Sequence, residues 1–138
     1  MVYLDANVFV FAALGKDALG DASRHILANL QKIGAKTCCL TIDELAWVVL
    51  RRVDNVTAVK ACKAVLTLRD LDVVSIQYGD MWKMAELMET FGLRPRDAVH
   101  LAIMKRLGEK TITTEDIHFD IKNLGVKRIP IEKFAKSL

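Results

Sequence analysis

MVYLDANVFVF, residues 1–11, is almost entirely apolar but carries Asp5 and Asn7 in its middle. Residues 2–4 predict a short buried strand, and residues 7–14 predict a helix that follows it at once. A charged carboxylate is costly to bury without a partner. Asp5 therefore either caps the helix that begins at Asn7 or meets polar side chains supplied by later parts of the chain.

The same order of strand and helix continues along the sequence. We expect further strands at residues 37–40, 72–76, 110–113 and 126–130. We expect further helices at residues 21–33, 41–53, 55–68, 78–91, 95–107 and 117–123. Strands that alternate with helices favour a mostly parallel sheet with helices on both faces. The sequence thus predicts an α/β protein with a three-layer α/β/α architecture.

Several helix ends carry recognisable signals. Thr41 is a suitable N-cap, and Glu44 follows it at the spacing of a capping box. Gly92 suits the end of the helix at residues 78–91, because glycine adopts left-handed backbone angles readily. Pro95 and Gly108 similarly suit the start and the end of the next helix.

The composition narrows the class of protein. Of the 138 residues, 52% are hydrophobic and 27% are charged, which excludes a disordered chain and fits a single domain over residues 1–138. A net charge of +3 is compatible with a nucleic-acid partner but does not require one. No apolar run reaches the roughly 20 residues of a membrane span, and no basic segment precedes an apolar one as in a secretory signal.

The cysteines indicate a reducing compartment. Cys38, Cys39 and Cys62 lack the spacing of zinc ligands, and three cysteines cannot all pair within one chain. Free cysteines usually act as small buried hydrophobes. We therefore expect structural thiols in a cytoplasmic protein that has no membrane association.

Four acidic residues stand near expected strand ends or helix starts: Asp5, Glu44, Asp97 and Asp116. Ligands of an open parallel sheet bind beyond the carboxyl ends of its strands, so these side chains are expected to crowd together. Any one of them has an ordinary explanation as a helix cap, a capping-box partner or a turn residue. Two carboxylates about 4 Å apart, however, repel by ~4 kcal/mol at an effective dielectric of ~20. Such a cluster needs protons or a hard divalent cation such as Mg²⁺ or Mn²⁺.

Four segments carry a family resemblance: YLDANVF (residues 3–9), LTIDELAWVV (40–49), RPRDAVHLAI (94–103) and ITTEDIHFD (112–120). Their order and spacing resemble the acidic motifs of PIN-domain nucleases, in particular the small VapC toxins of prokaryotic toxin–antitoxin pairs. The resemblance spans essentially the whole chain. Each motif alone is weak evidence, whereas four motifs in order within 138 residues are specific.

The resemblance implies a Rossmann-like fold and hydrolysis of RNA phosphodiester bonds that depends on Mg²⁺ or Mn²⁺, with the acids as metal ligands and not as nucleophiles. It also implies an RNA substrate, an antitoxin protein as partner and a homodimer. The expected catalytic and metal-binding residues are Asp5, Glu44, Asp97 and Asp116, and the expected polar supports are Asn7 and Thr114. Trp47 and Val48 are candidates for the dimer interface, although Trp47 also suits the core of one subunit.

The last motif departs from the family pattern. The family often carries an acid two positions after the fourth acid and then Phe, whereas this chain has His118 and Phe119. We place the fourth acid at Asp116, because its distance to Phe119 keeps the family spacing, with Glu115 as the alternative. Asp120 is a candidate to replace the missing charge.

The histidines and two other functions stay open at this point. His25, His100 and His118 lack zinc-ligand spacing, but His100 and His118 are candidates to support the acids. A PIN fold that binds RNA or protein without cutting is the main alternative, although such a protein has no electrostatic reason to keep four repelling acids. A phosphatase of the haloacid dehalogenase type would use Asp5 as nucleophile in a D-x-D motif, but Asn7 occupies the second acidic position.

Overall fold

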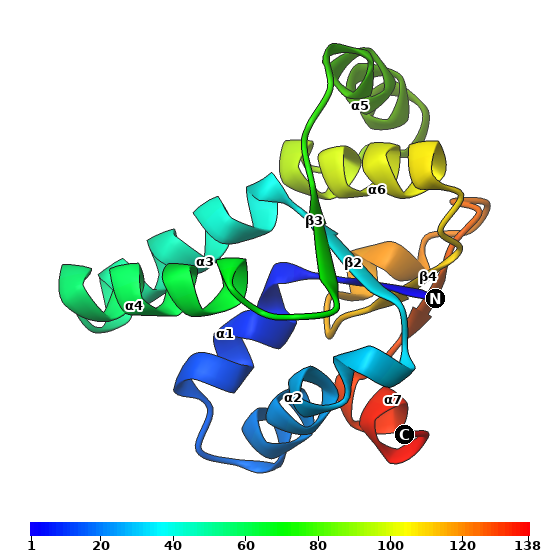
Figure 1. Ribbon diagram of the computed structural model, residues 1–138. Coiled ribbons are helices and arrows are strands. Elements are labelled where there is room, and N and C mark those ends of the chain that lie inside the picture. Colours follow the sequence, from blue (N-terminus) through cyan, green and yellow to red (C-terminus); the bar gives the residue numbers. More distant parts are fainter.

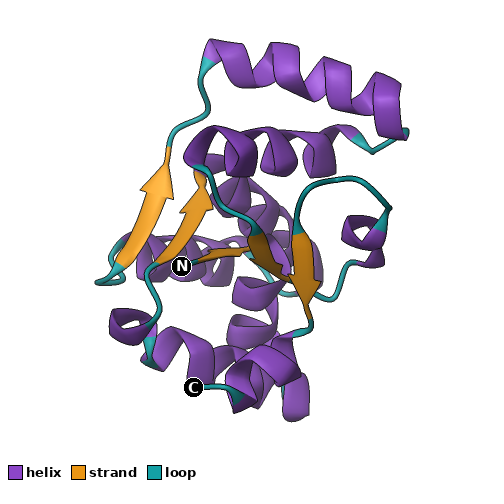
Figure 2. Cartoon of the chain, turned by 90° about the vertical axis from the view of Figure 1, so that its right-hand side faces the viewer, coloured by secondary structure: helices purple, strands orange, loops and turns teal.

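The computed structural model describes all 138 residues, and its centre is a sheet of five parallel strands. The strands are β1 (Val2–Leu4), β2 (Ala35–Cys38), β3 (Leu71–Val74), β4 (Thr111–Thr113) and β5 (Lys127–Ile129). Their order across the sheet is β3-β2-β1-β4-β5, and every neighbouring pair is parallel. Figure 2 shows the strands of the sheet between helices that lie above and below them. The chain therefore builds one half of the sheet outward from β1 and then crosses back to begin the other half beside β1.

Helices cover both faces of this sheet. They are α1 (Ala6–Leu14), α2 (Ala18–Ala28), α3 (Cys39–Arg52), α4 (Asn55–Leu66), α5 (Tyr78–Phe91), α6 (Pro95–Leu107) and α7 (Ile131–Lys136), with short 3-10 helices η1 (Leu30–Lys32) and η2 (Ile117–Asp120). Figure 1 shows α5 and α6 stacked on one side of the sheet, α1, α2 and α7 on the other, and the α3–α4 pair projecting outward. The predicted three-layer α/β/α architecture is confirmed. None of the helices has both the length and the apolar character needed to cross a membrane.

The residues of β1 show how the two apolar layers arise. Successive side chains of a strand point to opposite faces of the sheet. Val2 and Leu4 accordingly pack into one cluster with Phe9 of α1, and Tyr3 packs into a second cluster with Leu101 of α6. All five side chains are almost fully buried. An apolar strand with no polar face is typical of the centre of a parallel sheet.

The helices α5 and α6 begin and end where the sequence predicts. Gly92 and Gly108 follow them with φ of +68° and +71°, the left-handed region that favours glycine. Pro95 is the first residue of α6, where its missing N–H leaves no helical hydrogen bond unmade. These signals are local, so the sequence alone was sufficient to find the pair.

The predicted cap of α3 is wrong. Strand β2 ends at Cys38 and α3 begins at Cys39, so no loop separates them. Thr41 lies inside the helix, fully buried, and its hydroxyl pairs with that of Thr37 at 2.7 Å. Glu44 therefore completes no capping box, and its carboxylate is available for other contacts.

Other elements also differ from the expectation, including β2, which was expected at residues 37–40 and lies at Ala35–Cys38. The helix expected at residues 21–33 begins earlier, at Ala18, because Asp17 accepts a hydrogen bond from the backbone of Gly20, and it ends at Ala28 before η1. The helix expected at residues 117–123 is the shorter 3-10 helix η2. The sequence interpretation also missed α7, which packs against α2.

Candidate metal centre

Asp5 and Thr114 lie directly beyond the carboxyl ends of β1 and β4, where the chain changes from one half of the sheet to the other. This is the position at which open α/β sheets bind their ligands. The hydroxyl of Thr114 donates to Oδ2 of Asp5 at 2.7 Å, and the amide of Asn7 donates to that hydroxyl at 2.9 Å. The two residues expected to support Asp5 thus hold its buried carboxylate in one orientation.

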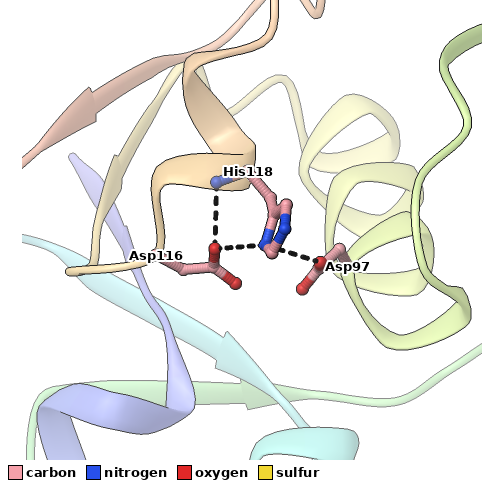
Figure 3. Close-up of side chains that lie close together, drawn as sticks. All are labelled: Asp97, Asp116 and His118. Carbon is pink, nitrogen blue, oxygen red and sulfur yellow. Dashed lines mark hydrogen bonds and ion pairs between the residues drawn. The ribbon is translucent and has the colours of Figure 1, made fainter.

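Asp97, Asp116 and His118 form a second group at the same edge. Asp97 lies in the first turn of α6, and Asp116 precedes η2. Oδ1 of Asp116 accepts hydrogen bonds from the backbone amide of His118 at 2.9 Å and from its Nδ1 at 2.6 Å. The same Nδ1 lies 3.8 Å from Oδ2 of Asp97, so the ring sits between the two carboxylates (Figure 3). One ligand atom from each of the three residues lies within 4.8 Å of the others.

Glu44 reaches the site through a histidine. Nε2 of His100 lies 2.5 Å from Oε1 of Glu44 and 3.8 Å from Oδ1 of Asp5. On the other side of the ring, Nδ1 of His100 pairs with the hydroxyl of Tyr3 at 2.7 Å and lies 3.6 Å from Sγ of Cys38. His100 therefore connects two of the expected acids to two buried strand residues.

Short contacts join these groups into one cluster. The backbone amide of Asp116 donates to the hydroxyl of Thr114 at 3.0 Å, and that hydroxyl also bonds Asp5. The charges of Asp116 and Asp5 both act on Asp97. The structure thus gathers all four expected acids and both expected supports at one edge of the sheet, from β1, α1, α3, α6 and the segment after β4.

The crowding of carboxylates changes their protonation. Burial, followed by the negative charges of Asp116 and Asp5, raises the pKa of Asp97 to about 6. Burial also raises the pKa of Asp5, although the charge of His100 and the Thr114 hydrogen bond oppose that effect. Asp97 and Asp5 therefore both hold a proton more readily than an ordinary aspartate does.

His100 is the positive charge within the cluster. Burial alone would lower its pKa, but hydrogen bonds with Cys38 and Glu44 and the charges of Asp5 and Glu44 raise it to about 10. The imidazolium then has a proton on each nitrogen, with Glu44 on one side and Tyr3 on the other. Its charge offsets part of the repulsion between the carboxylates.

The contacts of the acidic residues in the last motif show which of them belongs to the cluster. Oε2 of Glu115 accepts a hydrogen bond from the backbone amide of Ile131 at 2.8 Å, at the start of α7, so this side chain is engaged outside the cluster. Asp120 forms a two-pronged ion pair with Arg128 at 3.0 Å. The idea that Asp120 replaces the missing acid is therefore wrong, and the geometry favours Asp116 over Glu115.

The sequence interpretation missed Tyr3 and Cys38 as contacts of His100. Both belong to strands that read as purely apolar, and their polar atoms find a partner only when β1 and β2 lie side by side under α6. A weak signal was present, since a buried tyrosine hydroxyl normally needs a hydrogen-bond partner.

The donor set fits a divalent cation. Four carboxylates offer hard oxygen ligands, and burial together with the charges of Asp116 and Asp5 raises the pKa of Asp97. The side-chain oxygen Oδ1 of Asn7 is also buried without a hydrogen-bond partner, although the side-chain nitrogen Nδ2 of the same residue bonds Thr114. A bound cation would reduce the repulsion between the carboxylates and could give the unpartnered Asn7 oxygen a partner.

The family follows from a match over most of the chain. A sequence model of the PIN domain matches residues 2–123. The chain belongs to the PIN domain family. The matched stretch contains Asp5, Glu44, Asp97 and Asp116, so the acidic edge described above is the part of this PIN domain in which the motifs converge.

Solved structures with the same fold support this placement. VapC20 from Mycobacterium tuberculosis, described as a sarcin-ricin loop cleaving toxin, superposes with a TM-score of 0.75 at 17% identity, over 87% of this chain and 93% of that one. VapBC2 from Rickettsia felis, bound to a DNA fragment from its promoter, gives 0.71 at 16% identity over 94% and 98%. A toxin–antitoxin complex from Klebsiella pneumoniae gives 0.65 at 13% identity over 92% and 96%. No curated protein sequence matches the chain significantly.

Proposed function

We propose that this PIN domain is a metal-dependent endoribonuclease and the toxin of a toxin–antitoxin pair, with residues 1–138 acting as one nuclease domain. The observation that carries the proposal is the convergence of Asp5, Glu44, Asp97 and Asp116 at the edge of the sheet where β1 and β4 lie side by side. The similarity in fold to VapC20, which is described as a cleaving toxin, supports it.

In this proposal the four acids hold Mg²⁺ or Mn²⁺. When bound, such a cation polarises the scissile phosphate and lowers the pKa of the attacking water. The remaining tasks belong to the chain. Thr114 and Asn7 orient the Asp5 carboxylate, His100 holds Glu44 beside Asp5, and the backbone amide of His118 orients Asp116.

The deciding experiment is incubation of the purified protein with a mixed RNA pool in the presence of Mg²⁺, Mn²⁺ or EDTA. We expect defined fragments with either cation and none with EDTA, because in this proposal the acids act as metal ligands and the cation activates the attacking water. RNA that is bound but remains intact under all conditions would favour the alternative of a non-cleaving binding module. Cleavage that continues in EDTA would contradict a metal-dependent site.

The proposal of an antitoxin partner is supported by the complexes in which similar folds occur. The similar structures include a toxin–antitoxin complex and a VapBC assembly on DNA. In this chain an apolar groove lies between α1, α2, α3 and α4, lined by residues that include Phe9, Leu27, Leu45 and Leu68. We propose that an apolar helix of an antitoxin binds there and places a basic side chain in the acidic site. The three free cysteines support a cytoplasmic location.

The homodimer is proposed from the exposed surface of α3 and α4. Trp47 is 49% exposed with the Arg51 guanidinium stacked over its ring, so its assignment to the core of one subunit is wrong, while Val48 is half-buried. Leu50 and Val53 extend the exposed apolar surface beyond Trp47. Sedimentation should show a dimer at micromolar concentration that Trp47→Glu converts to monomer. A wild-type protein that sediments as a monomer would contradict this interface.

A further inference from the structure

His118 occupies a position between two candidate metal ligands. Its Nδ1 lies 2.6 Å from Oδ1 of Asp116 and 3.8 Å from Oδ2 of Asp97, and Figure 3 shows the ring directed into the space between the carboxylates. With the imidazole neutral and its proton on Nε2 in place of Nδ1, the three residues can offer one cation two carboxylate oxygens and the Nδ1 nitrogen. The expected metal ligands are all carboxylates, so an imidazole here changes the chemistry of the site.

The imidazole ring of His118 is partly exposed to solvent and does not belong to the hydrophobic core. The side chain of His118 is 43% exposed, whereas that of the next residue, Phe119, is buried in the core. The backbone amide of His118 donates to Asp116, which fixes the turn that begins η2 and keeps the two side chains adjacent. A ring held beside two carboxylates yet open to solvent is accessible to an incoming cation.

Divalent cations differ in the ligand atoms that they prefer. Mg²⁺ takes oxygen ligands almost exclusively, in a strict octahedral arrangement, and gives up its waters reluctantly. Imidazole suits transition metals such as Zn²⁺, Cu²⁺, Fe²⁺ and Ni²⁺, and Mn²⁺ is the weakest-binding member of the same series. A site of two carboxylates and one imidazole therefore binds a transition-metal ion better than an all-oxygen site does, relative to Mg²⁺.

We propose that His118 is a ligand of the metal centre and makes this PIN domain selective for a divalent transition metal over Mg²⁺. The proposal rests on the metal-dependent site described under the proposed function and specifies which class of cation that site takes. The competing explanation is that His118 only forms an ion pair with Asp116 and Asp97. In that case removal of the ring would affect Mg²⁺ and Mn²⁺ to the same extent.

Pulsed electron paramagnetic resonance of Mn²⁺ bound to the chain of residues 1–138 tests the contact directly. We expect ¹⁴N coupling of a directly coordinated imidazole in the wild type. His118→Asp and His118→Ala should remove it, and His25→Asn, which changes an exposed histidine of α2, should retain it. Persistence of the coupling in both His118 variants would overturn the assignment.

Calorimetric titration with Mn²⁺ and with Mg²⁺ gives the second readout. In His118→Asp the ratio of Mn²⁺ to Mg²⁺ affinity should fall on the order of tenfold, since an oxygen ligand replaces the nitrogen. An unchanged ratio would overturn the proposal. Mn²⁺-supported RNA cleavage without ¹⁴N coupling would overturn the role of His118 alone, whereas binding of neither cation would overturn the metal-dependent function as well.

Discussion

Asp97→Asn and Asp116→Asn should each lower the rate of RNA cleavage by roughly 100-fold or more. Both substitutions keep the size of the side chain but remove a negative charge from the group formed with His118. Metal-assisted stabilisation of charge in the transition state contributes several kcal/mol, and each 1.36 kcal/mol corresponds to a factor of about ten in rate. The measurement is single-turnover cleavage of one RNA substrate at saturating Mn²⁺ or Mg²⁺.

Glu115→Gln is the matched control for Asp116→Asn. The two residues are adjacent, but Glu115 bonds the backbone of Ile131 at the start of α7, and a glutamine oxygen can accept the same hydrogen bond. We therefore expect wild-type cleavage from Glu115→Gln. An inactive Glu115→Gln together with an active Asp116→Asn would place the fourth acid one residue earlier and contradict the assignment.

The layer architecture could be predicted from sequence because its determinants are local. The run Val2–Leu4 is apolar at every position, which indicates a strand covered on both faces, and Pro95 and Gly108 delimit α6. The start of α3 could not be found in the same way. Thr41 has the properties of an N-cap, but packing of its hydroxyl against Thr37 places it inside the helix. Tertiary contact overrides the local preference at this point.

The acidic residues of the candidate site could be identified from the sequence, but the hydrogen bonds and ion pairs between them and their neighbours could not. The motifs identified the acids, and the order of the strands explains why Asp5 and Thr114 meet. The sequence names His100 only as a candidate to support the acids. It does not indicate that Glu44 reaches Asp5 through His100, because those three residues come from three different parts of the fold. The role of Tyr3 beneath that ring likewise depends on the side-by-side placement of β1 and α6.

Asp97→Asn should also make the metal-free protein more stable at pH 8. The pKa of Asp97 is raised to about 6 in the folded protein, so between about pH 4 and pH 6 the folded state binds more protons than the unfolded state. The contribution of Asp97 therefore lowers the free energy of unfolding as the pH rises through that window. The loss of stability reaches its full size above about pH 6. With a side chain that is 15% exposed, the cost is at most about 3 kcal/mol.

Thermal unfolding at pH 4 and pH 8 in EDTA measures this effect. Asp97→Asn should raise Tm by several degrees at pH 8 and change it little at pH 4, because one kcal/mol shifts Tm by about 3–4 °C for a chain of this length. Asp43→Asn is the control, since Asp43 is exposed on α3 and has no hydrogen bond in the site. Equal gains at both pH values would show that the substitution acts through packing and not through charge.

The wild type and Asp97→Asn should respond to a divalent cation to different extents. A cation that binds only the folded state stabilises it by about 2.7 kcal/mol at 100 times its Kd, and it displaces the proton that Asp97 holds near pH 6. Millimolar Mn²⁺ should therefore raise the Tm of the wild type more than that of Asp97→Asn, whose amide is a poorer ligand. The higher Tm that the variant has without metal should then disappear. Calorimetry at pH 6 in two buffers of different ionisation enthalpy should show more proton release from the wild type than from Asp97→Asn. Identical heats in the two buffers would mean that no proton leaves Asp97 when the cation binds, and would contradict its place among the ligands.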